Sequence, residues 1–124
     1  MSKYKQQGFS NTFKNARKGM RIVLKSEVNI RVHFCVALVV LFMAFLLGFS
    51  INRICILILT IAMVIVTEMI NSAVEFTLDA FFHNRYSKLV GMAKDIAAGA
   101  VMLASVIAII IGVLLFGSAL LFDL

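Results

Sequence analysis

Charged residues are scarce in this chain of 124 residues, and proline and tryptophan are absent. Only 15% of the residues are charged and 62% are hydrophobic, whereas soluble domains have about 25% charged and about 45–50% apolar residues. A soluble fold of this composition would lack the polar side chains that cover a protein surface. The composition therefore excludes an ordinary soluble domain and indicates a membrane protein with short loops.

Cysteine is also rare, since only Cys35 and Cys55 occur and both lie within apolar runs. Two such residues do not make a disulfide framework or a CxxC metal site, so we interpret them as small hydrophobic side chains. No cleavable signal peptide is expected, because the first apolar run begins near residue 30 and is too long for one. The first apolar helix should therefore remain in the membrane.

The long apolar runs allow three membrane crossings, since each crossing takes about 20 helical residues. We expect an all-α fold in a single domain over residues 1–124, with transmembrane helices at about 30–49, 54–77 and 96–122 and a very short first turn near residues 48–53. Upstream, apolar residues recur every three or four positions between basic ones, which predicts an amphipathic helix on the membrane surface over about residues 8–25. Its apolar stripe comprises Phe9, Phe13, Ala16, Met20, Val23 and Leu24.

The basic residues are distributed unevenly along the chain. Eight of the twelve lie within the first 31 residues, and Arg85, Lys88 and Lys94 lie in the expected second loop, whereas the first turn has only Arg53. The positive-inside rule therefore places the amino terminus and the second loop in the cytoplasm. We interpret the net charge of +6 as an orientation signal and a basic rim for an anionic substrate and lipid headgroups, with no role in binding nucleic acid.

Acidic residues are few, and most of them gather near one membrane interface. Glu68, Asn71 and Glu75 are spaced to share one helix face, and Asp79 lies one turn further on. The expected spans bring this face to the cytoplasmic interface, at the same depth as Glu27, Lys94 and Asp95. Carboxylates there could hold Mg²⁺ together with a phosphate, and the lysine could neutralise phosphate oxygens. The pattern suits phosphoryl transfer.

Other interpretations remain open from the residues alone. Asp95 could be a helix N-cap, Glu27 could stabilise a helix start, and Glu68 could pair with a lysine. A transporter or an ion-conducting oligomer would have an ionisable residue near the midplane of the membrane, but no span has one there. A regulatory membrane subunit is a third possibility. No Walker motif occurs, so any nucleotide site would be of a different kind.

In the third span, small residues recur every fourth position, at Ala100, Ala104, Ala108 and Gly112. Small residues at this spacing let another helix approach closely. They predict tight helix packing or oligomerisation.

Three segments resemble the small prokaryotic integral-membrane diacylglycerol kinase family: EMINSAVEFTLD at 68–79, AKDIAAGAV at 93–101 and SEVNIRVH at 26–33. The resemblance covers the chain from about Phe9 to the end of the third span, with the expected order and spacing. It implies a homotrimer of three-helix subunits in the bacterial plasma membrane. It also implies phosphorylation of a lipid alcohol by MgATP at the cytoplasmic face, in sites between subunits.

The resemblance also assigns roles to individual residues. Glu68 would be the catalytic base, and Asn71 would orient the base or the substrate. Glu27 and Glu75 would bind Mg²⁺ and the nucleotide. The remaining nucleotide contacts would come from Lys94, Asp95 and Tyr86.

Two branches of the family differ in their acceptor lipid. The stretch from Glu27 to His33 and the run DIAAGAV resemble the undecaprenol kinase branch, so we expect undecaprenol, with diacylglycerol as the alternative. The second loop departs from many relatives, because Arg85, Tyr86 and Ser87 stand where those have an acidic residue, Tyr and His. We interpret His83 as a solvated loop residue.

Overall fold

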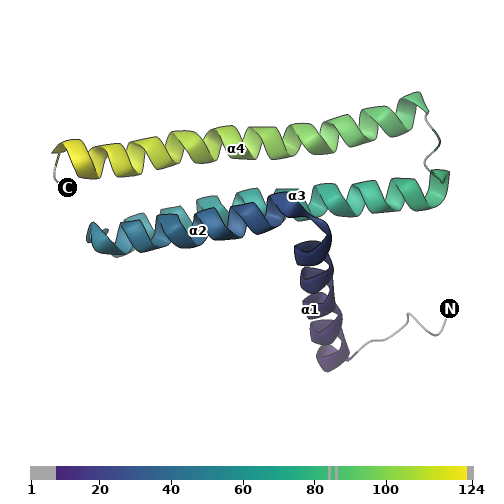
Figure 1. Ribbon diagram of the computed structural model, residues 1–124, viewed down its shortest axis with the longest axis horizontal. Coiled ribbons are helices and arrows are strands. Elements are labelled where there is room, and N and C mark those ends of the chain that lie inside the picture. Colours follow the sequence, from purple (N-terminus) through teal and green to yellow (C-terminus); the bar gives the residue numbers. More distant parts are fainter. Residues whose placement is uncertain (1–7, 84, 86, 123–124) are drawn as a thin grey trace.

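The computed structural model describes residues 8–83, 85 and 87–122. This part of the chain forms the helices α1 (Phe9–Ser26), α2 (Val28–Leu46), α3 (Ile51–Phe82) and α4 (Lys88–Phe122). In Figure 1, α2, α3 and α4 run along the long axis of the molecule and α1 lies crosswise to them. α3 packs against both α2 and α4. The predicted all-α class is confirmed.

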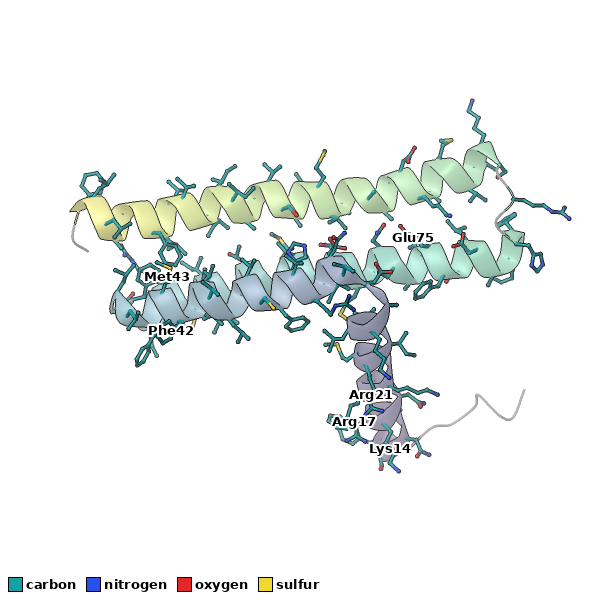
Figure 2. The ribbon with its side chains drawn as sticks, viewed as in Figure 1. Lys14, Arg17, Arg21, Phe42, Met43 and Glu75 are labelled. Atoms are coloured by element: carbon teal, nitrogen blue, oxygen red, sulfur yellow. The ribbon has the colours of Figure 1, made fainter. Side chains whose placement is uncertain are left out.

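Three of these helices, α2, α3 and α4, are long and apolar enough to cross a membrane, as predicted. Their large apolar side chains are widely exposed in the single chain, and Phe42 and Met43 on α2 are examples (Figure 2). At about 1.5 Å per residue, α3 and α4 are each roughly 50 Å long, against about 30 Å of hydrocarbon. Part of each helix therefore extends beyond the hydrocarbon, and α3 continues well past α1.

A sharp bend separates α1 from α2. Glu27 alone lies between them, with an extended backbone (φ −115°, ψ 108°). The Arg31 guanidinium reaches back and donates hydrogen bonds of 2.8 Å to the carbonyls of Leu24 and Lys25. These carbonyls have no partner within the helix because α1 ends there. Arg31 thus caps α1 from the first turn of α2.

The turn between α2 and α3 is shorter than predicted. Gly48 adopts a left-handed conformation (φ 70°), which ends α2 and which glycine adopts without strain. The Ser50 hydroxyl accepts a hydrogen bond from the backbone N–H of Arg53, so α3 begins at Ile51. Asn52 and Arg53, which we expected in the turn, belong to the first turn of α3.

The boundary of α4 also differs from the prediction. His83 ends α3 in a left-handed conformation (φ 49°) and is exposed. The Ser87 hydroxyl then accepts a hydrogen bond from the N–H of Val90, and α4 begins at Lys88 rather than near residue 96. Lys94 and Asp95 are therefore inside the helix, and the alternative in which Asp95 is an N-cap is wrong.

The small residues of α4 pack against this chain only in part. Ala104 is buried, whereas Ala100 is exposed. A Cβ atom added at Gly112 would have no neighbour within 4 Å. Packing within this chain therefore does not require a glycine at this position.

Candidate functional site

The most buried acidic side chain in the described part of the chain is that of Glu68 on α3. The residue is only 8% exposed, and its Oε1 lies 3.3 Å from Nε2 of His33 on α2. A carboxylate inside a membrane helix is costly unless it has a partner. The packing of α2 on α3 supplies this partner, and it is a histidine rather than the lysine of the alternative interpretation.

One turn further along α3, Asn71 and Glu75 form a second pair. The Asn71 Nδ2 donates a hydrogen bond of 3.4 Å to Oε1 of Glu75. The Oδ1 atom of Asn71 is buried and has no hydrogen-bond partner. A buried carbonyl oxygen without a donor is rare in folded proteins, and here it stands beside a carboxylate that is only partly buried.

Glu27, the remaining predicted metal ligand, is on a different element. It lies at the bend between α1 and α2, is partly buried, and caps neither helix with its side chain. Its carboxylate is therefore not engaged in capping. Next to the bend, α1 and α3 enclose a cavity of about 470 Å³ lined mainly by apolar groups, among them Met20, Val23 and Phe76.

Lys94 does not meet Glu68 in the single chain. Its Nζ donates a hydrogen bond of 2.8 Å to Oδ1 of Asp79. Asp79 lies about 16 Å along α3 from Glu68, at 1.5 Å per residue. The polar residues thus follow α3 over several turns rather than meeting at one depth, because α4 runs antiparallel to α3 from a turn beyond Phe82.

The other predicted nucleotide contacts are more exposed or lie outside the described residues. Asp95 is exposed on α4, and Tyr86 is outside the described residues. Lys94 and Asp79 line a small cavity of about 160 Å³ together with Arg85 and Gly91. Two basic side chains therefore border this end of the site. Figure 2 shows Glu75 on the segment of α3 that extends past α1, and Lys14, Arg17 and Arg21 along α1.

A metal ion would find some of its ligands here, but not a complete set. Within residues 8–83, 85 and 87–122, no three His, Cys, Asp or Glu side chains come together to hold a metal. The unpaired Asn71 oxygen and the adjacent Glu75 carboxylate are nevertheless hard oxygen donors, which Mg²⁺ prefers. Mg²⁺ commonly takes its remaining ligands from water and substrate phosphates. The donor set fits Mg²⁺ delivered with a nucleotide.

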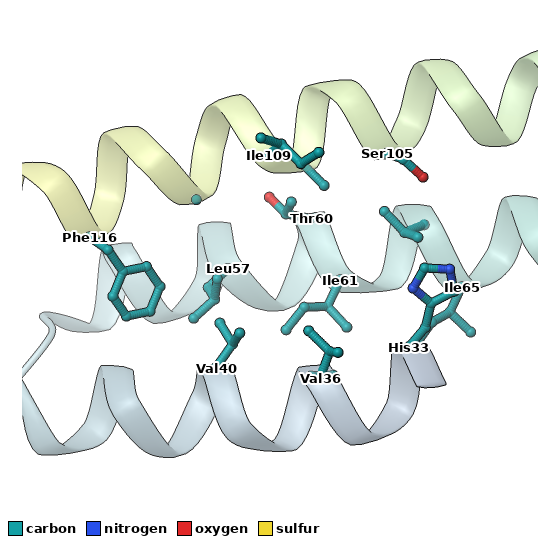
Figure 3. Close-up of a pocket in the computed structure, with 14 residues that line it drawn as sticks. His33, Val36, Val40, Leu57, Thr60, Ile61, Ile65, Ser105, Ile109 and Phe116 are labelled. Atoms are coloured by element: carbon teal, nitrogen blue, oxygen red, sulfur yellow. The ribbon is translucent and has the colours of Figure 1, made fainter. Parts of the chain in front are cut away.

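An apolar groove of about 350 Å³ leads away from the His33–Glu68 pair between α2, α3 and α4. Figure 3 shows His33 at one end and Phe116 at the other, with Val36 and Thr60 between them. The Thr60 hydroxyl donates to the carbonyl of Ile56, so its proton is already engaged. At the Phe116 end, the ring packs on Phe49 at 4.9 Å, and the Arg53 guanidinium lies 5.5 Å from the centre of the Phe49 ring.

This geometry joins an apolar groove to a buried carboxylate, and the carboxylate to a line of oxygen donors and basic groups along α3 and α4. A lipid alcohol in the groove could bring its hydroxyl to the end where His33 lines the groove and contacts Glu68. A phosphate donor would meet Glu75, Asn71 and the basic side chains on the other side. The arrangement can support proton removal from a hydroxyl and charge neutralisation on a phosphate.

Two partners in this site were not predicted. In the sequence, His33 stands out only as part of a family segment, and Asp79 only as a continuation of the acidic face. The pairs His33–Glu68 and Asp79–Lys94 each join two different helices. A single histidine in an apolar span was the one signal in the sequence that could have drawn attention to His33.

The chain is similar to known proteins over most of its length. Residues 14–116 match the prokaryotic diacylglycerol kinase family. A diacylglycerol kinase from Synechocystis is 34% identical over 101 residues, which cover 82% of this chain and 58% of that protein. An undecaprenol kinase from Bacillus subtilis is 36% identical over 108 residues, which cover 87% of each chain. The chain therefore spans little more than half of the first relative and most of the second.

Proposed function

Because this chain belongs to the prokaryotic diacylglycerol kinase family, we propose that it is an ATP-dependent membrane lipid kinase whose acceptor is undecaprenol. The observation that carries the proposal is the apolar groove that ends at the His33–Glu68 pair. The groove offers a lipid tail an apolar surface along about 12 Å of α3, from Leu57 to Ile65, at 1.5 Å per residue. With the tail in the groove, the hydroxyl of the lipid would lie at the end next to His33 and the buried Glu68.

The lining of the groove favours a polyprenol over diacylglycerol. All the lining residues except His33, Thr60 and Ser105 are apolar, and the proton of the Thr60 hydroxyl is already donated. The ester carbonyls of diacylglycerol would find few hydrogen-bond donors there, and leaving a buried polar group unpaired costs about 1–3 kcal/mol. A polyprenol tail has no such groups. The match to an undecaprenol kinase over 87% of both chains supports the same acceptor.

In the proposed reaction, Glu68 accepts the proton of the lipid hydroxyl while the hydroxyl oxygen forms a bond to the γ-phosphorus of ATP. The bond from this phosphorus to the bridging oxygen breaks, and ADP leaves. Asn71, Glu75 and Glu27 would hold Mg²⁺, which neutralises phosphate charge when bound. Lys94 would be drawn from Asp79 towards the nucleotide phosphates, with Asp95 beside it.

The proposed assembly is a homotrimer with sites between subunits, oriented in the bacterial plasma membrane with the amino terminus in the cytoplasm. The apolar faces that α2 and α4 expose in the single chain suit contact with lipid and neighbouring subunits. The basic face of α1 suits anionic headgroups at the cytoplasmic surface. This orientation places the ends of α3 and α4 that carry Glu75 and Lys94 on the side where ATP is available.

A competition assay tests the function. Purified protein in detergent micelles receives radiolabelled ATP, Mg²⁺ and equal amounts of undecaprenol and diacylglycerol, and the labelled lipids are separated. We expect undecaprenyl phosphate as the main product and no transfer by the Glu68→Gln variant. Preferential labelling of diacylglycerol would overturn the acceptor, and no labelled lipid at all would overturn the kinase.

A further inference from the structure

The contact between His33 and Glu68 links two helices at the head of the groove. The two residues are 35 positions apart in the sequence, and Nε2 of His33 lies 3.3 Å from Oε1 of Glu68. Their burial differs, because the Glu68 side chain is 10% exposed and the His33 side chain is 32% exposed. The His33 ring lines the groove (Figure 3) and also contacts the Glu68 carboxylate.

This contact affects which carboxylate oxygen of Glu68 is available. Among the described residues, His33 is the side chain that hydrogen-bonds to Glu68, and it takes Oε1. A carboxylate has two oxygens, and a donor fixed on one of them restricts rotation of the group and leaves the other for a second donor. An apolar side chain at position 33 would leave the carboxylate free to turn.

Assuming the function proposed above, we infer that His33 is a positioning residue for Glu68, holding Oε1 through Nε2–H so that Oε2 faces the hydroxyl of the acceptor lipid. In the transfer step the hydroxyl proton moves to Oε2 as the new oxygen–phosphorus bond forms and the bond to ADP breaks. His33 itself gains and loses no atoms in this step. Its position at the groove end also places the ring beside the first carbons of the bound alcohol.

A purely structural role for His33 makes different predictions from a positioning role. A structural partner only satisfies a buried carboxylate, and its loss would lower stability and impair kcat and both KM values together. A positioning residue acts on the geometry of the chemical step, so that its loss lowers kcat while the KM for MgATP stays close to its original value. Misplacement of a catalytic group by about 1 Å can cost about 100-fold in rate.

The test compares three substitutions at one position. We expect His33→Ala and His33→Leu to lower kcat by about 10- to 100-fold, with little change in the KM for MgATP. His33→Gln retains an N–H donor of suitable length and should recover most of this loss. Cys35→Ala is the matched control, because Cys35 is exposed on the same helix two residues away and does not line the groove.

Circular dichroism and thermal unfolding in detergent show whether each variant folds. If His33→Ala does not fold, the kcat values of His33→Gln and His33→Leu are compared instead, and a higher kcat in His33→Gln supports the positioning role. Unchanged kcat in His33→Leu, equal losses in the Gln and Leu variants, or failure of all three variants to fold would each overturn the inference. A wild-type protein that labels no lipid alcohol would instead overturn the proposed function on which the inference depends.

Discussion

Individual side chains on α3 carry most of the chemistry proposed for this protein. The buried Glu68 is paired with His33, whereas Asn71 keeps an unpaired oxygen beside Glu75. One face of one helix thus holds a paired carboxylate, suited to proton transfer, and an incompletely satisfied group of oxygens, suited to a cation. Because Glu68, Asn71 and Glu75 are three and four residues apart, they lie on the same face of α3, one turn after another.

At this scale we expect Glu75→Gln to raise the Mg²⁺ concentration that gives half-maximal lipid phosphorylation about tenfold or more, because the substitution removes a charge from a proposed metal ligand. Titration of Mg²⁺ at saturating ATP and acceptor measures this shift. Asp79→Asn is the matched control, since it removes the same charge one turn further along α3, where the carboxylate pairs with Lys94. Equal Mg²⁺ dependence of the two variants would exclude Glu75 as a ligand.

The helices of this protein begin and end through specific local interactions. Ser50 and Ser87 supply hydroxyl groups at the starts of α3 and α4, and Gly48 ends α2 in a left-handed conformation. Arg31 binds the last carbonyls of α1. This last interaction helps to fix the direction of α1 relative to α2, and with it the place of Glu27.

For the helix ends, we expect Arg31→Met to destabilise the last turn of α1. The substitution keeps an apolar stem of similar length but removes two hydrogen bonds to exposed carbonyls, at a cost of about 1 kcal/mol. Amide hydrogens of the last turn should then exchange about fivefold faster, as measured by mass spectrometry in detergent. Arg21→Met, an equal charge change on the exposed face of α1, should leave that exchange unaltered. Unaltered exchange in Arg31→Met would show that the cap does not stabilise this end of α1.

If the proposed roles hold, a single chain does not bring all the residues of the kinase site together. Lys94 is held at Asp79, three turns of α3 beyond Glu68 at about 3.6 residues per turn. α2 and α4 expose large apolar surfaces. The proposed trimer with sites between subunits would explain both features, because a neighbouring subunit would cover the apolar faces and bring its own basic groups to Glu68.

Mixed trimers test this assembly. Glu68→Gln and Lys94→Ala subunits should each be inactive alone. When the two are co-expressed in equal amounts, about a quarter of the sites should regain both residues if these come from different subunits of a symmetric trimer. Lipid phosphorylation by the purified mixture measures the recovery. Mixing Glu68→Gln with Asn71→Ala is the control, because these residues share one helix face and no mixed site regains both. An inactive Glu68→Gln and Lys94→Ala mixture would contradict a site shared in this way.

The pattern of residues along the chain determined which segments become helices and which face of α3 carries acidic groups. Length and hydropathy predicted three spans, and the period of the apolar residues predicted α1, because both depend on neighbours a few residues away. The exact ends were less predictable. α4 begins at Lys88, where the Ser87 hydroxyl caps it. Hydropathy alone predicted a start near residue 96, because it detects only the apolar part of the helix.

The partners of the ionisable side chains depend on how the helices pack in three dimensions. The pairing of Glu68 with His33, the pairing of Lys94 with Asp79 and the groove between α2, α3 and α4 depend on how helices distant in sequence are rotated and shifted against each other. Composition and periodicity do not encode that register. A shift of one helix by a single residue moves a side chain by about 1.5 Å along the axis and about 100° around it, which is enough to break either pair.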